Sequence, residues 1–439
     1  MTELQQILEA ARKAGAQQAE VYQVANEETP VKFEANRLKE LNARRTKGVA
    51  LRVIKDGRIG FASSTKPGDV EDLVHAAIET SPFGPEAHFD FPGPAEAPGV
   101  DVYDPATQAV TADEMIETGQ KLVDAVRTAE PDAQADASVR RVAGKIALAN
   151  TAGASVEYQA TMLQAWVHGT LIRGTDMLFV GDGDATCTPE IDTKRIGEMV
   201  ARQLEYSRRN ATCRTADMPV IFTGDGVASA LLGPLVMAFS GRLVSQGQSP
   251  LAEKLGDELY DARLSVYDDS TLPMRPASRP FDDEGVASRR IPLIDKGVVR
   301  SFMYDLQSAG VAGATSTGSA NRSLTTQPAI SPSSILFSEG DTTFEEMVKG
   351  VKEGLVVEEL MGAGQGNVMG GDFSGNVLLG YKIENGEIVG RVKDTIVAGN
   401  VHKALASVLA LGSEARWIGG TIYTPPMLFE HLAVSAKSS

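Results

Sequence analysis

The chain carries few side chains of the types that bind metals or act as nucleophiles, and they form no familiar short motif. The five histidines are scattered through the sequence: His75, His88, His168, His402 and His431. It contains no His-Glu-x-x-His, Cys-x-x-Cys or Gly-x-Ser-x-Gly pattern. A zinc site requires several His, Cys or carboxylate ligands on a rigid frame. Such side chains could still meet in space, but their spacing alone indicates no catalytic set.

Three local patterns resemble binding motifs and are better explained as loops. Glu86, His88 and Asp90 lie in a proline-rich stretch, residues 81–105, which gives metal ligands no rigid support. Asp182 and Asp184 stand in a GDGD run that lacks the later oxygen ligands of a calcium loop, so we interpret it as a turn. The glycine-rich residues 362–371 lack the Lys-Ser/Thr ending of a phosphate-binding loop.

Composition narrows the class of protein. The 439 residues include 58 acidic and 42 basic side chains, for a net charge of −16. An excess of carboxylates argues against a nucleic-acid-binding surface and against binding to anionic lipid. No apolar run approaches the length of a membrane span. Two isolated cysteines, Cys187 and Cys213, cannot form a disulfide framework, and we expect both to be packing residues of a cytoplasmic protein.

The residues that must position any site are organised around one apolar helix. A short strand-like run at residues 220–222 is followed by Asp225, a candidate helix cap. Apolar side chains then recur every four residues, at Val227, Leu231, Leu235 and Phe239, and further apolar residues fill the neighbouring stripes. A helix that is apolar on nearly every side is a buried one. Pro234 falls inside it and should kink it or end its first half.

The order of helical and strand-like segments predicts an α+β fold with three parts. Residues 1–105 read as an N-terminal α+β unit that ends in the proline-rich stretch, and residues 106–215 as a middle α+β unit. Residues 216–439 read as a mainly antiparallel β domain around the buried central helix. Asp56-Gly57, Asp295–Gly297 and Asn385-Gly386 predict tight turns between paired strands. A helix should begin at Thr111, with Asp113 and Glu114 in its first turn.

Several stretches in this order resemble the TldD/TldE family, also called PmbA or "modulator of DNA gyrase". They are GVALRVIKDGRIGFAS, IPLIDKGVVRSFMYD, STGSANR and GGDFSGNVLLGYKIENGEIVGRVKDTIVAGN. The resemblance covers nearly the whole chain. It implies the three-part layout and a role in proteolysis. It also implies that TldD-type members carry a zinc-binding His-Glu-x-x-x-His on the central helix and a further cysteine near the C-terminus, and pair with TldE-type members that lack the motif.

The central helix departs from that zinc pattern. The resemblance places the motif at about Leu232, Gly233 and Met237, where this chain reads LGPLVM. The C-terminal region has no cysteine. We therefore expect a TldE/PmbA-like chain with no metal or other cofactor of its own, zinc being held only by a partner subunit. Whether the chain has catalytic activity by itself is left open.

The leading hypothesis is a non-catalytic subunit of a two-component zinc metalloprotease that acts in peptide proteolysis or maturation. Its partners would be a second copy or a zinc-bearing TldD-like subunit, together with an unfolded peptide substrate, and neither nucleic acid nor membrane. A peptide can add as a strand to a sheet edge, and glycine-rich residues 310–318 and 362–371 allow close backbone approach, although each segment by itself is better explained as a tight turn. The residues assigned to peptide binding lie in the segments that carry the resemblance: Tyr304, Asn321, Arg322, Gly370, Gly371 and Asp372.

Two alternatives belong to other classes. The chain could be a homodimeric peptide-binding or scaffold protein with no role in proteolysis. It could also be a hydrolase with an unrecognised non-zinc site, for example Asp305 or Asp372 acting with Tyr304, His402 or Arg322.

Overall fold

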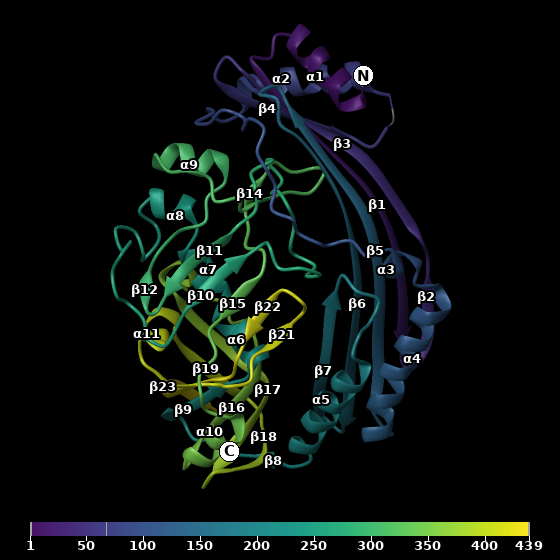
Figure 1. Ribbon diagram of the computed structural model, residues 1–439. Coiled ribbons are helices and arrows are strands. Elements are labelled where there is room, and N and C mark those ends of the chain that lie inside the picture. The colour runs from purple at the N-terminus through teal and green to yellow at the C-terminus, as the bar shows by residue number, and fades with distance from the viewer. Residues whose placement is uncertain (1, 67, 438–439) are drawn as a thin grey trace.

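A long, curved sheet stands beside a C-terminal domain that is built around a central helix (Figure 1). The computed structural model describes residues 2–66 and 68–437. The long sheet is antiparallel throughout, in the order β4-β3-β1-β5-β6-β7, and β2 pairs with β1. Its strands are β1 (Gln18–Glu34), β2 (Arg37–Leu41), β3 (Arg44–Lys55), β4 (Arg58–Ser64), β5 (Gln134–Asn150), β6 (Ser155–Arg173) and β7 (Asp176–Thr186).

The boundary expected between residues 105 and 106 does not separate two sheets. β1 lies between β3 and β5, so that Val21 is opposite Leu51 on one side and Ala149 on the other. The first and second units therefore share one sheet, because the backbone groups of β1 point alternately to its two edges and pair with β3 on one and with β5 on the other. The proline-rich stretch joins them as an extended arm, with Phe91 and Val102 buried.

Helices cover the long sheet at its two ends (Figure 1). The helix predicted to begin at Thr111 is present and starts with a capping box: the Thr111 hydroxyl accepts from the Glu114 N–H, and the Glu114 carboxylate accepts from the Thr111 N–H. Helices α4 and α5 bury their apolar faces against β5, β6 and β7. The helical segments of this half are α1 (Glu3–Lys13), α2 (Val70–Thr80), η1 (Ser81–Phe83), α3 (Pro105–Ala109), α4 (Ala112–Ala129) and α5 (Thr193–Tyr206).

The C-terminal domain contains a mixed sheet of eight strands. Its path runs β16-β9-β23-β19-β17-β18-β8, with β20 on β23, and a further β16–β17 pairing closes five of the strands into a ring. The predicted Asn385-Gly386 turn joins β17 to β18. The strands are β8 (Asn210–Ala211), β9 (Ala216–Phe222), β16 (Glu353–Met361), β17 (Asp372–Glu384), β18 (Glu387–Val392), β19 (Thr395–Asn400), β20 (Val408–Leu411) and β23 (Met427–Ala436).

A six-stranded sheet and a two-stranded sheet complete this domain. The six-stranded sheet follows the order β12-β11-β10-β15-β22-β21, and β13 pairs with β14 alone. Their strands are β10 (Val266–Asp269), β11 (Arg290–Asp295), β12 (Val298–Val299), β13 (Ala320–Asn321), β14 (Ala329–Ile330), β15 (Ile335–Phe337), β21 (Arg416–Ile418) and β22 (Ile422–Thr424). The fold is therefore α+β, with the mainly antiparallel C-terminal domain expected from the sequence.

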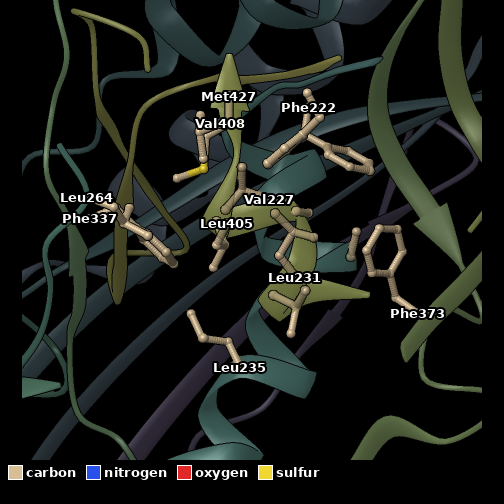
Figure 2. Close-up of a cluster of buried hydrophobic side chains, with 14 of the residues drawn as sticks. Phe222, Val227, Leu231, Leu235, Leu264, Phe337, Phe373, Leu405, Val408 and Met427 are labelled. Atoms are coloured by element: carbon tan, nitrogen blue, oxygen red, sulfur yellow. The ribbon is translucent and has the colours of Figure 1, made fainter. Parts of the chain in front are cut away.

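The central helix is two short helices, α6 (Gly224–Ala230) and α7 (Leu232–Ala238), broken at Leu231. Pro234 is the third residue of α7, where its missing N–H costs no intrahelical bond. The N-cap is Thr223 and not Asp225, because the Thr223 hydroxyl accepts from the Gly226 N–H. Val227, Leu231 and Leu235 point into the apolar core (Figure 2). The remaining helices are α8 (Gly241–Ser245), α9 (Leu306–Ala312), α10 (Phe344–Gly350), α11 (Val401–Ala406) and η2 (Val368–Gly370).

Among the helices of the described residues, none is long and apolar enough to cross a membrane.

Candidate functional site

The positions of the expected zinc motif lie on α7 and carry no donor suited to zinc. Leu232 is partly buried against the core, Gly233 is exposed beside open space, and the Met237 side chain is 36% exposed. Zinc in proteins is bound by His nitrogen, Cys sulfur or carboxylate oxygen. Within residues 2–66 and 68–437, no group of three or more His, Cys, Asp or Glu side chains is placed to hold a metal ion. The side chains present therefore do not fit the zinc that the family pattern implies.

A polar cluster lies next to this helix, since η2 contacts α7. The Asn400 side-chain amide donates to the Gly370 carbonyl and to Asp372 Oδ1, both at 2.8 Å. Gly371 has a φ of 90°, and an added Cβ there would lie 2.4 Å from a His402 ring carbon. Glycine at 371 therefore allows the 370–372 turn to lie directly on the imidazole.

His402 is oriented by a tyrosine and not by an acid. Its Nδ1 lies 2.9 Å from the Tyr260 hydroxyl, while its Nε2 is enclosed and has no hydrogen-bond partner among the described residues. Burial lowers the pKa of His402, which favours the neutral imidazole. The two acids of the non-zinc hypothesis are engaged in structural contacts. Asp305 caps α9, and Asp372 accepts a hydrogen bond from the Asn400 side chain. These contacts do not assemble a nucleophile, base and acid.

The other three residues assigned to peptide binding lie elsewhere. Asn321 is exposed on β13, and Tyr304 packs against Gly241 at the start of α8. Arg322 is buried: its Nη1 lies 2.9 Å from Glu20 Oε1, and its guanidinium lies 4.2 Å from the centre of the Tyr22 ring. The structure therefore brings only Gly370, Gly371 and Asp372 of the six together with one another, and Arg322 joins the C-terminal domain to the long sheet.

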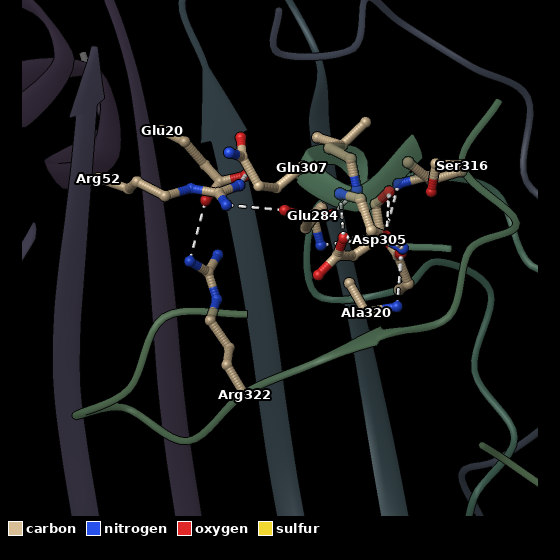
Figure 3. Close-up of polar contacts among 12 residues, drawn as sticks. Glu20, Arg52, Glu284, Asp305, Gln307, Ser316, Ala320 and Arg322 are labelled. Carbon is tan, nitrogen blue, oxygen red and sulfur yellow. Dashed lines mark hydrogen bonds and ion pairs between the residues drawn. The ribbon is translucent and has the colours of Figure 1, made fainter. Parts of the chain in front are cut away.

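Arg322 belongs to a buried ionic seam made of Glu20, Arg52, Glu284 and Arg322 (Figure 3). Glu20 and Arg52 are opposite each other on β1 and β3, with Arg52 Nη2 3.1 Å from Glu20 Oε2. Arg52 Nη1 lies 2.7 Å from Glu284 Oε1, and the other Glu284 oxygen accepts from the Leu306 N–H at 2.7 Å. Strands β1 and β3 therefore each contribute one charged side chain that pairs with a residue of the C-terminal domain: Glu20 with Arg322, and Arg52 with Glu284.

A second polar contact between the two halves was missed by the sequence interpretation. The GDGD run is part of strand β7 and not a turn, so Asp182 faces the C-terminal domain. Asp182 Oδ2 lies 2.8 Å from Arg195 Nη1, and Asp182 Oδ1 lies 3.2 Å from Arg416 Nη1. Arg416 also pairs with Asp225 in the first turn of α6. Arg416 lies 234 residues from Asp182 and 191 residues from Asp225, so these two pairs gave no local signal in the sequence.

Glu358 is a buried acid near this contact and forms no ion pair within the described residues. It is 3% exposed and accepts a hydrogen bond from the Thr223 hydroxyl at 3.2 Å. Burial, together with the negative charge of Asp225, raises the pKa of Glu358 to about 7. Glu358, Asp225 and His168 border a cavity of about 680 Å³ between the long sheet and α6.

Comparison with known proteins identifies the fold first. The structure of TldE from Thermococcus kodakarensis superimposes with a TM-score of 0.88 at 22% identity, covering 99% of this chain and 100% of that chain. A "putative modulator of a DNA gyrase" from Thermotoga maritima has a TM-score of 0.87 at 22% identity, covering 98% and 99%. The class is thus an α+β protein with a TldE-like fold.

The family follows from the sequence comparison. Residues 215–436 match the PmbA/TldA metallopeptidase C-terminal domain, and residues 19–81 match PmbA/TldA metallopeptidase domain 1. The relatives include "Metalloprotease PmbA" of Escherichia coli O157:H7, 27% identical over 83% of this chain and 81% of that protein. A "Metalloprotease" of Methanothermobacter thermautotrophicus is 24% identical over 87% and 84%. The chain belongs to the PmbA/TldD family, as the resemblance predicted.

Proposed function

We propose that this chain is a TldE-like subunit of a two-component zinc metalloprotease and does not itself supply the zinc site. The observation that carries the proposal is the surface of α7, where Leu232, Gly233 and Met237 occupy the expected motif positions. The absence of cysteine from the C-terminal region supports it, because the resemblance implies a further cysteine in that region of TldD-type chains.

In this role the chain contributes structure around a partner's catalytic centre. Met237 and Met369 are both exposed, on α7 and on η2, which contact each other. Exposed methionines are flexible and polarizable, and they suit surfaces that adapt to a partner or a varied peptide. This surface supports an assembly in which the motif positions of α7 face a second subunit or its substrate and not bulk water.

The test combines this chain with a zinc-bearing TldD-like subunit from the same source. We expect each purified chain alone to cleave an unfolded peptide slowly or not at all, and the mixture to cleave it in a zinc-dependent manner. A matched control uses the partner with the Glu of its His-Glu-x-x-x-His changed to Gln, which should assemble normally and remain inactive. Elemental analysis of this chain after dialysis provides an independent readout.

Two results would contradict the proposal. One is about one tightly held zinc per chain in the pure protein, and the other is zinc-dependent cleavage by this chain alone. Light scattering of the mixture separates the remaining alternative. A homodimer that ignores the zinc-bearing chain and still binds peptide would favour the scaffold hypothesis.

A further inference from the structure

A cavity of about 720 Å³ lies between α8, α9, β14 and the edge of the long sheet, apart from the motif positions of α7. Helices α8 and α9 pack against each other beside β14 (Figure 1). The volume of this cavity falls in the range of pockets that enclose small ligands, roughly 300–1,000 Å³. Nothing in the family comparison assigns it a role.

One cation in the wall of this cavity has no internal partner. Arg242, on α8, is exposed and forms no ion pair with the described carboxylates, although acidic residues outnumber basic ones in the chain. The other charges at the cavity are engaged: Arg52 and Glu284 neutralise each other, and Asp305 Oδ1 caps α9 through Ser308. Arg242 is therefore the charge left for a ligand, and a guanidinium fork matches a carboxylate.

A free strand edge borders the same cavity. β14 pairs only with β13 in the described chain, with Ala329 opposite Asn321 and Ile330 opposite Ala320. The Ser331 N–H donates to the Ser319 carbonyl on that side. Because backbone groups alternate along an antiparallel strand, the N–H and C=O of Ile330 face away from β13. They are available to an extended peptide that adds to this edge.

The remaining walls are mixed in polarity. Leu243, Val311 and Ile330 supply apolar surface, while Gln246, Gln248 and Gln327 supply amides that are exposed to solvent. We infer that this cavity binds the free C-terminal end of a short peptide, with the terminal carboxylate on Arg242 and the backbone on Ile330. A small number of polar groups would then fix the chain end, and the apolar wall would receive a side chain without strong sequence demand.

Such a site gives the chain a ligand of its own, whatever its partner does. A peptide with a new carboxyl end is the product of any endopeptidase, so the site would retain or align cleaved segments. The inference does not depend on the subunit role, since binding can be measured on the isolated chain without zinc.

The experiment is calorimetric titration of the isolated chain with acetyl-Ala-Ala-Ala-Leu as the free acid and as the C-terminal amide. We expect the acid to bind at least tenfold more tightly than the amide. Arg242→Gln should reduce acid binding to the level of the amide. Arg37→Gln is the matched control, since Arg37 is also exposed and lies on β2, away from the cavity.

Two further probes test the other walls. Val311→Trp should fill the cavity and weaken both peptides at least tenfold, whereas Leu255→Trp, at another exposed apolar position, should not. A peptide with methylated backbone nitrogens should also bind at least tenfold more weakly, because it cannot donate to the Ile330 carbonyl.

The inference is overturned if the acid and amide bind equally, or if neither saturates the protein at millimolar concentration. Stronger binding of a peptide amide with a free amino terminus would also overturn it, because the acids of the cavity would then be the recognising groups. Failure of any of these tests would leave the mixing experiment with the zinc-bearing subunit unaffected.

Discussion

The central-helix core and the ionic seam are both buried, but the core consists of apolar side chains and the seam of charged ones. The core brings together apolar side chains of α6, α7 and the C-terminal sheets (Figure 2). The seam encloses two acids and two arginines between the long sheet and the C-terminal loops (Figure 3). Burial alone therefore does not indicate how a residue contributes to stability.

The energetics of the two regions differ accordingly. Burying a large aliphatic side chain stabilises the fold by roughly 1.5–3 kcal/mol. An intact buried ion pair contributes little net stability, because desolvation offsets the attraction, but removing one partner leaves an uncompensated charge. In the core, the loss in free energy of unfolding should grow with the side-chain volume that a substitution removes. In the seam, removing a single charge should cause a large loss, because its partner is left buried and unpaired.

The largest effect is expected from Arg52→Met. This change leaves the carboxylates of Glu20 and Glu284 buried without their shared cation and removes the contacts of the guanidinium with the Phe89 and Phe91 rings. The free energy of unfolding should fall by about 3–5 kcal/mol, measured by urea denaturation. Arg45→Met is the control, because its pair with Glu27 is exposed and should contribute less than about 1 kcal/mol. Equal effects at the two positions would refute the contrast.

Leu235→Ala tests the core. Leu235 is 1% exposed in the middle of the apolar cluster, so its truncation should cost about 2–5 kcal/mol through lost burial and a cavity. Leu232→Ala is the matched change one turn away on the same helix, and it should cost clearly less because Leu232 is only partly buried. The apolar pattern on nearly every side of this helix does not distinguish the two positions. Equal losses would show that Leu232 is as enclosed as Leu235.

The difference between Leu232 and Leu235 shows which structural features the sequence predicts and which it does not. Spacing of Val227, Leu231, Leu235 and Phe239 predicted a buried helix, and all four are buried, because helical periodicity is a local property. The turns at Asp56-Gly57 and Asn385-Gly386 were also predicted, because turn residues act locally. Whether Leu232 or Leu235 is the more deeply buried depends on neighbours that are distant in the chain, and local spacing does not encode these neighbours.

The site was less predictable than the fold. Glu284 is 232 residues from its partner Arg52 along the chain, and charged residues are by default assigned to the surface. Arg322 was selected for peptide binding because of its motif, but the structure shows it in the seam. The resemblance placed the motif positions on the central helix, and Leu232, Gly233 and Met237 do lie on α7, whereas no residue pattern indicated the cavity beside Arg242.

Glu358 extends the comparison to pH. Its pKa in the fold is raised to about 7, so between pH 4.5 and 7 the folded state binds more protons than the unfolded chain. Its contribution to stability is present in full below about pH 4.5 and is lost as the pH rises through about 7. Glu358→Gln keeps the shape without the charge, so its stability relative to the parent should improve by on the order of 2 kcal/mol between pH 5 and pH 8.

The measurement is the free energy of unfolding of both proteins at pH 5, 6, 7 and 8. Glu430→Gln serves as the control, since Glu430 is exposed on β23 and its replacement should leave the profile of the parent unchanged. A Glu358→Gln profile parallel to that of the parent would mean that the buried acid titrates as it does in the unfolded chain.

The smallest effect is expected from restoring the motif residues with Leu232→His, Gly233→Glu and Met237→His. An added side chain at Gly233 meets open space, and Met237 is exposed, so the triple variant should lose only the stability that comes from the partly buried Leu232 side chain. It should still neither hold stoichiometric zinc nor cleave unfolded peptides in added zinc. The C-terminal ligand is absent, and the helix carries Pro234 between the two new histidines. In addition, residues five apart do not share a face of a regular helix, so ligand identity alone does not supply the geometry that tetrahedral zinc needs.

Elemental analysis and a peptide-cleavage assay check both points, with Leu232→Gln, Gly233→Glu and Met237→Gln together as the control for added polarity. Zinc-dependent cleavage by the histidine variant above the rate of that control would show that the supporting residues of a catalytic site are already in place around α7.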